Sequence, residues 1–471
     1  MPSTAIVWFR RDLRLADHPA LDRARRDHDH VIPVFIDDTA AEGDWARGAA
    51  SRWWLHHSLC ELDERLRDRG SRLVLARGDS LEALRRIRNA SGAEAVYWNR
   101  VYEPLLVERD RKVKHALRND GLTVESCNGS LLFQPWQLLK SDGSPYRVFT
   151  PFWKQMQKHW TPPLASPEPC RLAASKRWPA SLELDGLALL PQLDWADGFK
   201  DRWAPGELGG KRQLHRFVEQ TVADYDRQRD FPGTAGTSRL SPHLHFGEVS
   251  PVQVARALDE AGELPAGKGR WSFLREIAWR EFSAHLLFHY PYLADKPLNP
   301  SFNDFPWRKA QDYADDLRAW RMGRTGIPMV DAGMRELWAT GWMHNRVRMV
   351  VASFLTKNLL IPWQEGARWF WDTLVDADLA NNTQGWQWTA GCGADAAPYF
   401  RVFNPVLQGE KFDPDGRYVR RWCPELASRK GRRIHQPIAP QEAEKFDYPV
   451  SGVDLKRSRE RALEAWQKIR T

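Results

Sequence analysis

Cysteine is scarce in this sequence, and no two cysteines have the spacing of a metal-binding or redox pair. Among 471 residues there are only five, at Cys60, Cys127, Cys170, Cys392 and Cys423. Scattered single cysteines argue against a C-x-x-C zinc cluster or a disulfide frame and are typical of a reducing compartment. We therefore expect a cytoplasmic protein without a structural metal site.

Long apolar segments and targeting signals are also missing. No stretch approaches the roughly 18 apolar residues that a membrane-spanning helix needs. The N-terminal segment MPSTAIVWFRRDLR has a short apolar run that soon reaches arginines, unlike a signal peptide. No internal repeat is present that would indicate a solenoid. The sequence thus predicts a globular protein with no membrane partner.

Tryptophan and positive charge are the two features present in excess. The chain has 24 tryptophans, more than core packing requires, and a formal net charge of +8. A basic balance favours a polyanionic partner, such as a nucleic acid. The length allows two or three domains.

Residues 1–130 alternate between short apolar runs and amphipathic stretches. This βαβα rhythm predicts a doubly wound parallel sheet in a Rossmann-like domain. The first run is followed by RRDLRLADHPAL and not by a G-x-G-x-x-G turn, so a dinucleotide in the usual place is not expected. The expected strands are 5–9, 31–36, 73–76 and 95–98, and the expected helices are 49–69, 80–89 and 105–118.

Residues 131–200 are rich in proline, and the helical signal begins after them. We expect an interdomain linker with little regular structure over this stretch, which includes Pro162, Pro163, Pro167, Pro169 and Pro179. Residues 201–471 are expected to form an all-α domain. Its expected helices are 207–225, 274–290, 313–322, 330–340, 342–357, 365–375 and 455–470.

The segment DADLANNTQGWQW, residues 376–388, is both polar and aromatic. Its two acids, paired asparagines and two tryptophans fit neither a helix surface nor an alternating strand. We expect a loop that wraps a flat, polar ligand, either a planar cofactor or a base. The alternative is a surface loop with incidental aromatic residues.

Three further motifs each have a functional and a structural interpretation. GTSRLS, residues 236–241, suits a phosphate or is a helix N-cap with a solvated arginine. Glu276, Trp279 and Arg280 share a helix face and form either a platform for a base or a salt bridge beside a core tryptophan. Asn345, with Met349 one turn later, is either a specific contact or an exposed helix residue.

The histidine pairs and the aromatic series also need interpretation. His285 and His289 are spaced as two metal ligands but lack a third, so we do not predict a metal. His56 with His57, and His243 with His245, are interpreted in the same way. Trp307, Trp363 and Trp386 are either oxidisable rings of an electron path or core residues of a helical domain.

Several long motifs together resemble the DNA photolyase and cryptochrome family. They include WFRRDLRLADHPAL, GTSRLSPHLHFGEVSP, LREIAWREF, TGIPMVDAGMRELWATGWMHNRVRM and DADLANNTQGWQW. The resemblance covers nearly the full length, in the family's order. Within the family the sequence looks most like a bacterial class I photolyase for cyclobutane pyrimidine dimers. It implies an α/β antenna domain and a helical domain that holds FAD in a folded conformation.

The resemblance also implies roles for individual residues. The expected FAD contacts are Tyr225, Thr237, Ser238, Arg239, Leu240, Ser241, Phe273, Arg280, Asp376, Ala377 and Asp378, with Asn382 beside the isoalloxazine N5. The expected dimer contacts are Glu276, Trp279, Asn345, Met349 and Trp388. The residues expected near the DNA strand are Arg229, Arg346, Arg401, Gln408 and Lys411. The expected electron relay runs from Trp386 through Trp363 to Trp307.

In the family, excited reduced flavin gives an electron to a flipped-out dimer, the ring splits, and the electron returns. Asn345 stands where enzymes for (6-4) lesions have a second histidine. Asn382 stands where plant cryptochromes tend to have Asp and animal ones Cys. These departures favour repair, with UV-damaged DNA as the partner of a monomeric enzyme, over the alternative of a cryptochrome-type blue-light receptor.

The second, antenna chromophore is left open by the sequence. Leu105 and Leu106 replace the Asn-Glu pair of folate-binding relatives, and Ala294 and Asp295 replace a Cys-Lys pair. Methenyltetrahydrofolate, 8-hydroxy-deazaflavin, another flavin and an empty site therefore remain alternatives.

Overall fold

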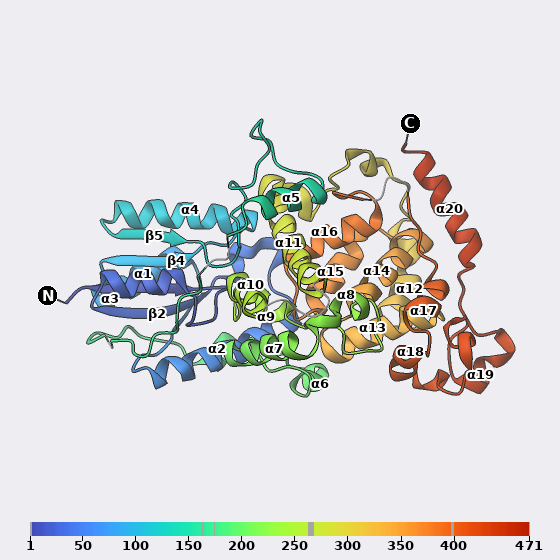
Figure 1. Ribbon diagram of the computed structural model, residues 1–471, viewed down its shortest axis with the longest axis horizontal. Helices are drawn as coiled ribbons and strands as arrows, with labels where there is room; N and C mark the ends of the chain where they lie inside the picture. The colour runs from blue at the N-terminus through green and yellow to red at the C-terminus, as the bar shows by residue number, and fades with distance from the viewer. Residues whose placement is uncertain (1, 162–163, 174, 262–267, 397–399, 471) are drawn as a thin grey trace.

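The computed structural model describes residues 2–161, 164–173, 175–261, 268–396 and 400–470. Pro162 and Pro163 of the expected linker lie outside these residues. Figure 1 shows a sheet with its helices at one end of the molecule and a larger group of helices at the other, with α20 along the far edge. This arrangement confirms the predicted fold class.

The sheet has five parallel strands in the order β3-β2-β1-β4-β5. Alternate residues of β1 face opposite sides: Val7 joins a core with α1 and α2, and Trp8 joins a core with α3 and α4. Helices on both faces explain why the strands are apolar runs. The strands are β1 (Thr4–Phe9), β2 (His30–Asp37), β3 (Val74–Arg77), β4 (Ala95–Asn99) and β5 (Thr123–Cys127).

Strand β5 is absent from the sequence prediction. In TVESC only Val124 is fully buried, because the strand is at the sheet edge and pairs only with β4. An edge strand with a single buried side chain lacks the apolar run by which the other four are recognised. The helices of this half are α1 (Pro19–Asp27), α2 (Ala49–Asp68), α3 (Ser80–Ser91) and α4 (Pro104–Asn119).

The stretch from 131 to 200 contains one helix of ten residues, α5 (Phe149–Lys158), and short turns that include α6 (Asp197–Lys200). Phe149 of α5 stacks on Trp279, with ring centroids 3.6 Å apart and planes within 8°. The part of the stretch around α5 is thus packed against the helical half, whereas Leu172, Leu187 and Leu189 join the core between the sheet and α2. Its boundaries as a linker, at 130 and 200, remain a prediction.

The helical half is built around one large core, to which α11 to α16 contribute. None of the described helices is long and apolar enough to cross a membrane. The helices are α7 (Glu207–Gln220), α8 (Tyr225–Gln228), α9 (Ser241–His245), α10 (Pro251–Glu260), α11 (Lys268–His289), α12 (Ala310–Arg321), α13 (Pro328–Thr340), α14 (Asn345–Ser353), α15 (Trp363–Thr373), α16 (Leu379–Ala390), α17 (Pro405–Phe412), α18 (Arg417–Trp422), α19 (Ala443–Phe446) and α20 (Leu455–Gln467).

Two predicted helices are interrupted. The predicted helix 207–225 ends at Gln220. Just beyond it, the Val222 carbonyl packs closely on Gly269 of α11: a Cβ atom on Gly269 would lie 1.9 Å from the Val222 oxygen. The stretch 342–357 begins only at Asn345, where the His344 side chain accepts a hydrogen bond from the Arg346 N–H. It then ends as a π-helix, η7 (Phe354–Asn358).

The stretch expected to be a loop at 376–388 is mostly a helix, so that prediction is wrong. Asp378 is the N-cap of α16, and its Oδ1 accepts from the Asn381 N–H at 2.9 Å. Gly391 ends the helix in the left-handed region, at φ 92°. The polar residues that obscured the periodicity are therefore an N-cap and the inward polar face of a helix between α11, α14 and α15.

Candidate functional site

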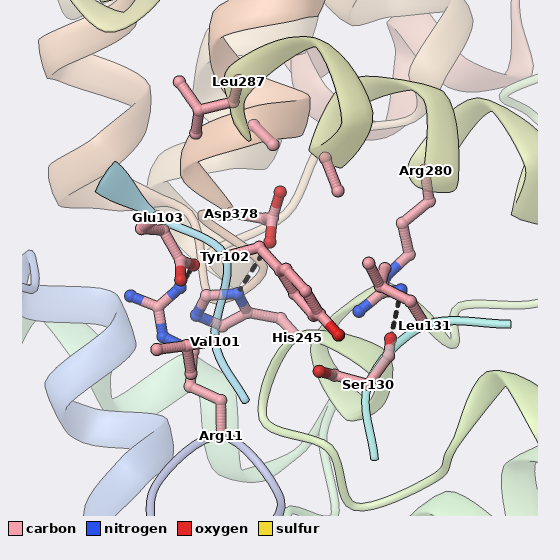
Figure 2. Close-up of a pocket in the computed structure, with 12 residues that line it drawn as sticks. Arg11, Val101, Tyr102, Glu103, Ser130, Leu131, His245, Arg280, Leu287 and Asp378 are labelled. Atoms are coloured by element: carbon pink, nitrogen blue, oxygen red, sulfur yellow. Dashed lines mark hydrogen bonds and ion pairs between the residues drawn. The ribbon is translucent and has the colours of Figure 1, made fainter. Parts of the chain in front are cut away.

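An open cavity lies where the loops after β1 and β4 meet the helical half. Figure 2 shows its lining side chains pointing inward from both halves. From the sheet side come Arg11, Tyr102 and Glu103, and from the helical side come Arg280 and Asp378. Two of the predicted flavin contacts, Arg280 and Asp378, thus share a cavity with residues that the sequence did not single out.

Asp378 is an ionised carboxylate in this cavity. Burial alone would raise the pKa of Asp378, but contact with His245, the charge of Arg280 and the Asn381 N–H together lower that pKa well below the ordinary value. Burial lowers the pKa of His245, and the neighbouring Asp378 opposes that lowering. The positive charge of Arg280 also favours the ionised form of Asp378.

His245 is the cavity residue with an unmet hydrogen bond. Its side chain is 5% exposed, its Nδ1 has no hydrogen-bond partner among the described residues, and Asp378 Oδ2 lies 3.7 Å away. A buried polar atom without a partner is destabilising unless a ligand satisfies it. This orphan nitrogen indicates that the cavity is built for a polar ligand.

Arg280 joins the two halves of the molecule at the same place. Its guanidinium donates to the Ser130 carbonyl at 2.8 Å and to the Leu244 carbonyl at 3.4 Å. Arg11 on the opposite wall pairs with Glu103. The cavity therefore has two fixed cations and two fixed anions on its walls, which suits a ligand with donors and acceptors on one edge.

Asp376 is held by an arginine that the sequence interpretation missed. Both oxygens of Asp376 accept from Arg348 Nη2, at 2.8 and 3.1 Å, and Arg348 Nε donates to the Met343 carbonyl at 2.7 Å. Arg348 lies one turn after His344, but its partner Asp376 is 28 residues away in the chain, so no local spacing marks the pair. Only tertiary packing brings the pair together.

The GTSRLS segment meets two other predicted flavin contacts. Leu240, Tyr225 and Phe273 belong to one buried cluster, in which the Tyr225 and Phe273 rings pack edge to face with centroids 5.2 Å apart. Arg239 has a positive φ of 51°, and its guanidinium lies over the Trp342 ring at 4.7 Å. A non-glycine residue in this region is strained, and such strain concentrates at ligand sites.

The predicted dimer contacts belong to α11, α14 and α16, and we call the surface that they would form the second face. Glu276 Oε1 accepts from Arg229 Nη1 at 2.6 Å. One face of Trp279 is covered by Phe149, so a base can stack only on its other face. Trp388 is partly buried and donates from Nε1 to the Asp395 carbonyl at 3.1 Å. The carboxylate and the two indoles are thus each held by a neighbour.

Asn345 does not stand in a helix interior, as the sequence interpretation assumed. It is the exposed first residue of α14, after the capping His344, so its helix propensity needs no special explanation. Arg346, the next residue of α14, pairs with Asp230 at 2.8 Å and lies over the Phe412 ring at 4.3 Å.

The remaining predicted DNA contacts lie at or before α17. Arg401 and Lys411 are exposed, whereas Gln408 is partly buried. Met349, on α14, is also partly buried. Helix α17 packs on α13 and α14, which places Gln408 and Lys411 on the element beside Asn345 and Met349.

The three tryptophans of the predicted relay belong to one core. Trp386 and Trp363 are each 2% exposed, and Trp307 packs at the edge of the same cluster. The Trp386 ring has Phe370 at 5.0 Å and Trp320 at 6.2 Å, measured between centroids. Asn382, one turn before Trp386, donates to the Ala367 carbonyl at 2.9 Å. The role of these rings remains a prediction.

The spaced histidines contact a backbone carbonyl. His285 Nδ1 and His289 Nε2 lie 3.2 and 3.1 Å from the Pro135 oxygen, and burial lowers the pKa of His285 to about 3. Among the described residues, no three His, Cys, Asp or Glu side chains converge as a metal site. These histidines anchor the segment after β5 to α11.

The strand order reverses at the carboxyl end of β1, a position where open sheets usually bind a ligand. Here Arg10 and Arg109 lie over the Trp8 ring at 4.6 and 4.8 Å. Trp8 is fully buried, so its ring belongs to the core of the sheet and is not exposed to a ligand.

Known proteins resemble the chain over its whole length. Two family models match, one described as "DNA photolyase" over residues 5–169 and one as "FAD binding domain of DNA photolyase" over residues 273–468. A deoxyribodipyrimidine photo-lyase of Agrobacterium fabrum is 48% identical over 99% of this chain and 98% of its own. Cryptochrome-2 of Arabidopsis thaliana is 40% identical over 97% of this chain and 75% of its own.

Solved structures agree with these relatives. A bacterial class III photolyase from Agrobacterium tumefaciens superposes with a TM-score of 0.94 at 48% identity, covering 100% of this chain and 98% of that one. An archaeal photolyase from Sulfolobus tokodaii, described with two FAD molecules, gives a TM-score of 0.81 at 31% identity and covers 99% and 100%.

Proposed function

The chain belongs to the DNA photolyase and cryptochrome family, and we propose that it acts within that family as a deoxyribodipyrimidine photo-lyase. It carries out light-dependent repair of DNA, with FAD as its cofactor. The observation that carries this proposal is the 48% identity to a photo-lyase along the full chain, together with a polar cavity that contains Arg280, Asp378 and the orphan nitrogen of His245.

The residues around the cavity fit a flavin. An ionised Asp378, the Arg280 guanidinium and the free Nδ1 of His245 offer an acceptor, a donor and a titratable nitrogen to one polar edge. Tyr225, Phe273 and the strained Arg239 segment would hold the rest of the cofactor. When bound, FAD supplies the light-driven electron transfer that opens the dimer, and the protein orients and insulates it.

The lesion is proposed to bind at the second face. There Trp388 and the free face of Trp279 would stack on a flipped-out dimer, and Glu276 would accept hydrogen bonds from its edge. The ion pair with Arg229 fixes the Glu276 carboxylate before the lesion arrives. Asn345, exposed at the start of α14, would add a second polar contact from the opposite side.

The DNA strand itself would be held by basic residues around this face. Arg229, Arg346, Arg401, Lys411 and the partly buried Gln408 are the proposed contacts, and the net charge of +8 favours a polyanion. A monomer in the cytoplasm suffices for this role, because all the proposed contacts come from one chain.

The class within the family is a separate proposal. The sequence motifs resemble those of class I. However, the solved photolyase that is 48% identical to this chain is described as class III, and we propose that this chain is also of class III. An absorption spectrum before and after denaturation identifies any second chromophore. At the strand-order reversal, the Trp8 ring is fully buried and so does not offer a stacking surface to a ring ligand.

The function is tested with purified protein and an oligonucleotide that contains one cyclobutane thymine dimer. Thymine should be restored under blue light and not in the dark. Binding should weaken steeply as salt rises, because phosphate contacts release counterions. A blue-light receptor of the cryptochrome type would bind flavin and respond to light but leave the dimer intact. That result would reject the proposal in favour of the alternative.

Replacing Glu276 by alanine should weaken repair without loss of flavin. The change removes one charge-assisted hydrogen bond to the lesion and leaves Arg229 without its carboxylate, so dimer affinity should fall by about tenfold. Affinity is measured by gel shift and flavin content by absorbance. Glu260→Ala, which breaks the exposed pair with Arg256, is the matched control. Equal loss in both variants would show that the position of Glu276 is immaterial.

A further inference from the structure

A second open cavity lies beside Trp388, and the function proposed above assigns no ligand to it. Four of its lining residues are aromatic and two are cationic: Trp388, Phe400, Phe403, Trp466, Lys357 and Arg401. Three of them belong to residues 400–403, which we call the lip. The lip carries the exposed Arg401, a proposed DNA contact, into the neighbourhood of the indole that is proposed to stack on the lesion.

Lys357 is a buried cation at the base of this cavity. Its side chain is 3% exposed, and among the described residues no carboxylate oxygen lies within 4.0 Å of its Nζ. The Nζ donates to the Arg401 carbonyl and lies 4.3 Å from the centroid of the Phe400 ring. Burial of an ammonium without an acid partner is destabilising, so its retention calls for a function.

The backbone around Lys357 is also unusual. Lys357 belongs to the π-helix η7, a rare conformation that is common at functional sites. The same turn region fixes the lip at a second point, because the Phe403 N–H donates to Ser353 Oγ at 3.1 Å. On the other side, Phe400 stacks on Trp466 of α20, with centroids 5.7 Å apart. The lip is thus clamped between η7 and the C-terminal helix.

We propose that Lys357 is a positioning residue for DNA binding: its ammonium holds the lip by the Arg401 carbonyl and the Phe400 ring, so that Arg401 is directed to a phosphate beside the lesion. This inference rests on the proposed function. The ammonium acts through the lip and does not touch the reacting dimer. Its hydrogen bond fixes the backbone of the residue whose side chain meets the DNA.

The charge on Lys357 makes the clamp dependent on pH. Burial lowers the pKa of Lys357 to about 7, with a smaller lowering by Arg401 and an opposing effect of Cys392. Burial raises the pKa of Cys392 to about 12, so this thiol stays neutral. From α20, the guanidinium of Arg461 contacts the neighbouring Asn358 carbonyl. As pH rises through about 7, Lys357 loses its proton, and the cation–π contact with Phe400 is lost with it.

The test compares Lys357→Met, Lys357→Arg and the wild type in gel shifts with dimer-containing DNA. Methionine removes the charge at similar length, and affinity should fall roughly tenfold with unchanged flavin content. Arginine stays protonated, so it should restore binding. Between about pH 6 and about pH 8.5 the wild type should lose affinity relative to Lys357→Arg, because only lysine titrates there.

Ser353→Ala tests whether the charge of Lys357 matters or whether any tether of the lip has the same effect. It removes the other tether, so it should weaken binding but keep the pH profile of the wild type. Equal affinity and equal pH profiles in Lys357→Met and the wild type would overturn the inference. A wild-type protein that does not distinguish dimer-containing from undamaged DNA would instead overturn the proposed function. Thermal unfolding of each variant shows whether it is folded.

Discussion

Asp378→Ala should yield purified protein with little bound flavin. Asp378 is the one side chain that caps α16, contacts His245 and faces Arg280 in the same cavity. Alanine removes the acceptor that the cofactor edge requires and takes a negative charge away from the partly buried Arg280 guanidinium. The ratio of flavin to protein absorbance after denaturation measures the effect.

The control for this variant is Asp454→Ala, because Asp454 caps α20 in the same way, with its carboxylate accepting from the N–H groups of Lys456 and Arg457. Both substitutions lose a cap, at about 1 kcal/mol each, but only the first should lose flavin. Asp378→Asn keeps a capping side chain and removes only the charge, so its flavin content separates the two roles. Wild-type flavin content in Asp378→Ala would contradict the assignment of the cavity.

The stability that the Asp378 carboxylate contributes should fall as the pH is lowered. The folded-state pKa of Asp378 lies below its unfolded value, so the carboxylate contributes stability at all pH values above the ordinary carboxyl range. That contribution is lost as pH falls through the ordinary range toward the folded-state pKa. Acid should therefore release flavin from the wild type more steeply than from Asp378→Asn, which has no carboxylate to protonate.

Trp386→Phe should abolish most of the light-driven reduction of oxidised flavin, yet leave repair by chemically reduced protein nearly intact. The indole is buried on α16, one turn after Asn382, and Gly366 of α15 lies so close that a Cβ there would be 2.0 Å from the ring. A phenyl ring fills much of this space but is far harder to oxidise. Absorbance during blue illumination follows the reduction, and dimer cleavage after dithionite treatment follows repair.

Trp371→Phe is the matched control, since Trp371 is also buried and packs edge to face on Trp45 outside the predicted relay. Both variants lose similar packing, on the order of 1–3 kcal/mol, and Trp371→Phe also loses the hydrogen bond from Trp371 Nε1 to the Ala46 carbonyl. Slower photoreduction in Trp386→Phe alone therefore reports on redox function. Loss of repair by pre-reduced Trp386→Phe would show that the ring supports the site and not an electron path. Equal photoreduction in both variants would remove Trp386 from the path.

Local hydrophobic patterns in the sequence predicted much of the architecture. The apolar runs of β1, β2, β3 and β4 mark strands covered on both faces, and α2, α3 and α4 could be placed within a few residues, whereas α1 was not predicted. The same patterns failed at the edge strand β5 and at α16, whose cap and inward polar face look like a loop until the neighbours are known. The long motifs established the family because they combine many residues in a fixed order.

The sequence by itself determined the fold class, the family and the residue types of the site. Tertiary structure alone decided which of these residues meet: Arg348 with Asp376, Glu276 with Arg229, His245 with Asp378, and Lys357 with the carbonyl of Arg401. These partners are 28 to 133 residues apart in the chain. The physical reason is that hydrophobic periodicity fixes which face of each element is buried, whereas a buried charge takes its partner from whatever polar group the packed neighbours bring within reach.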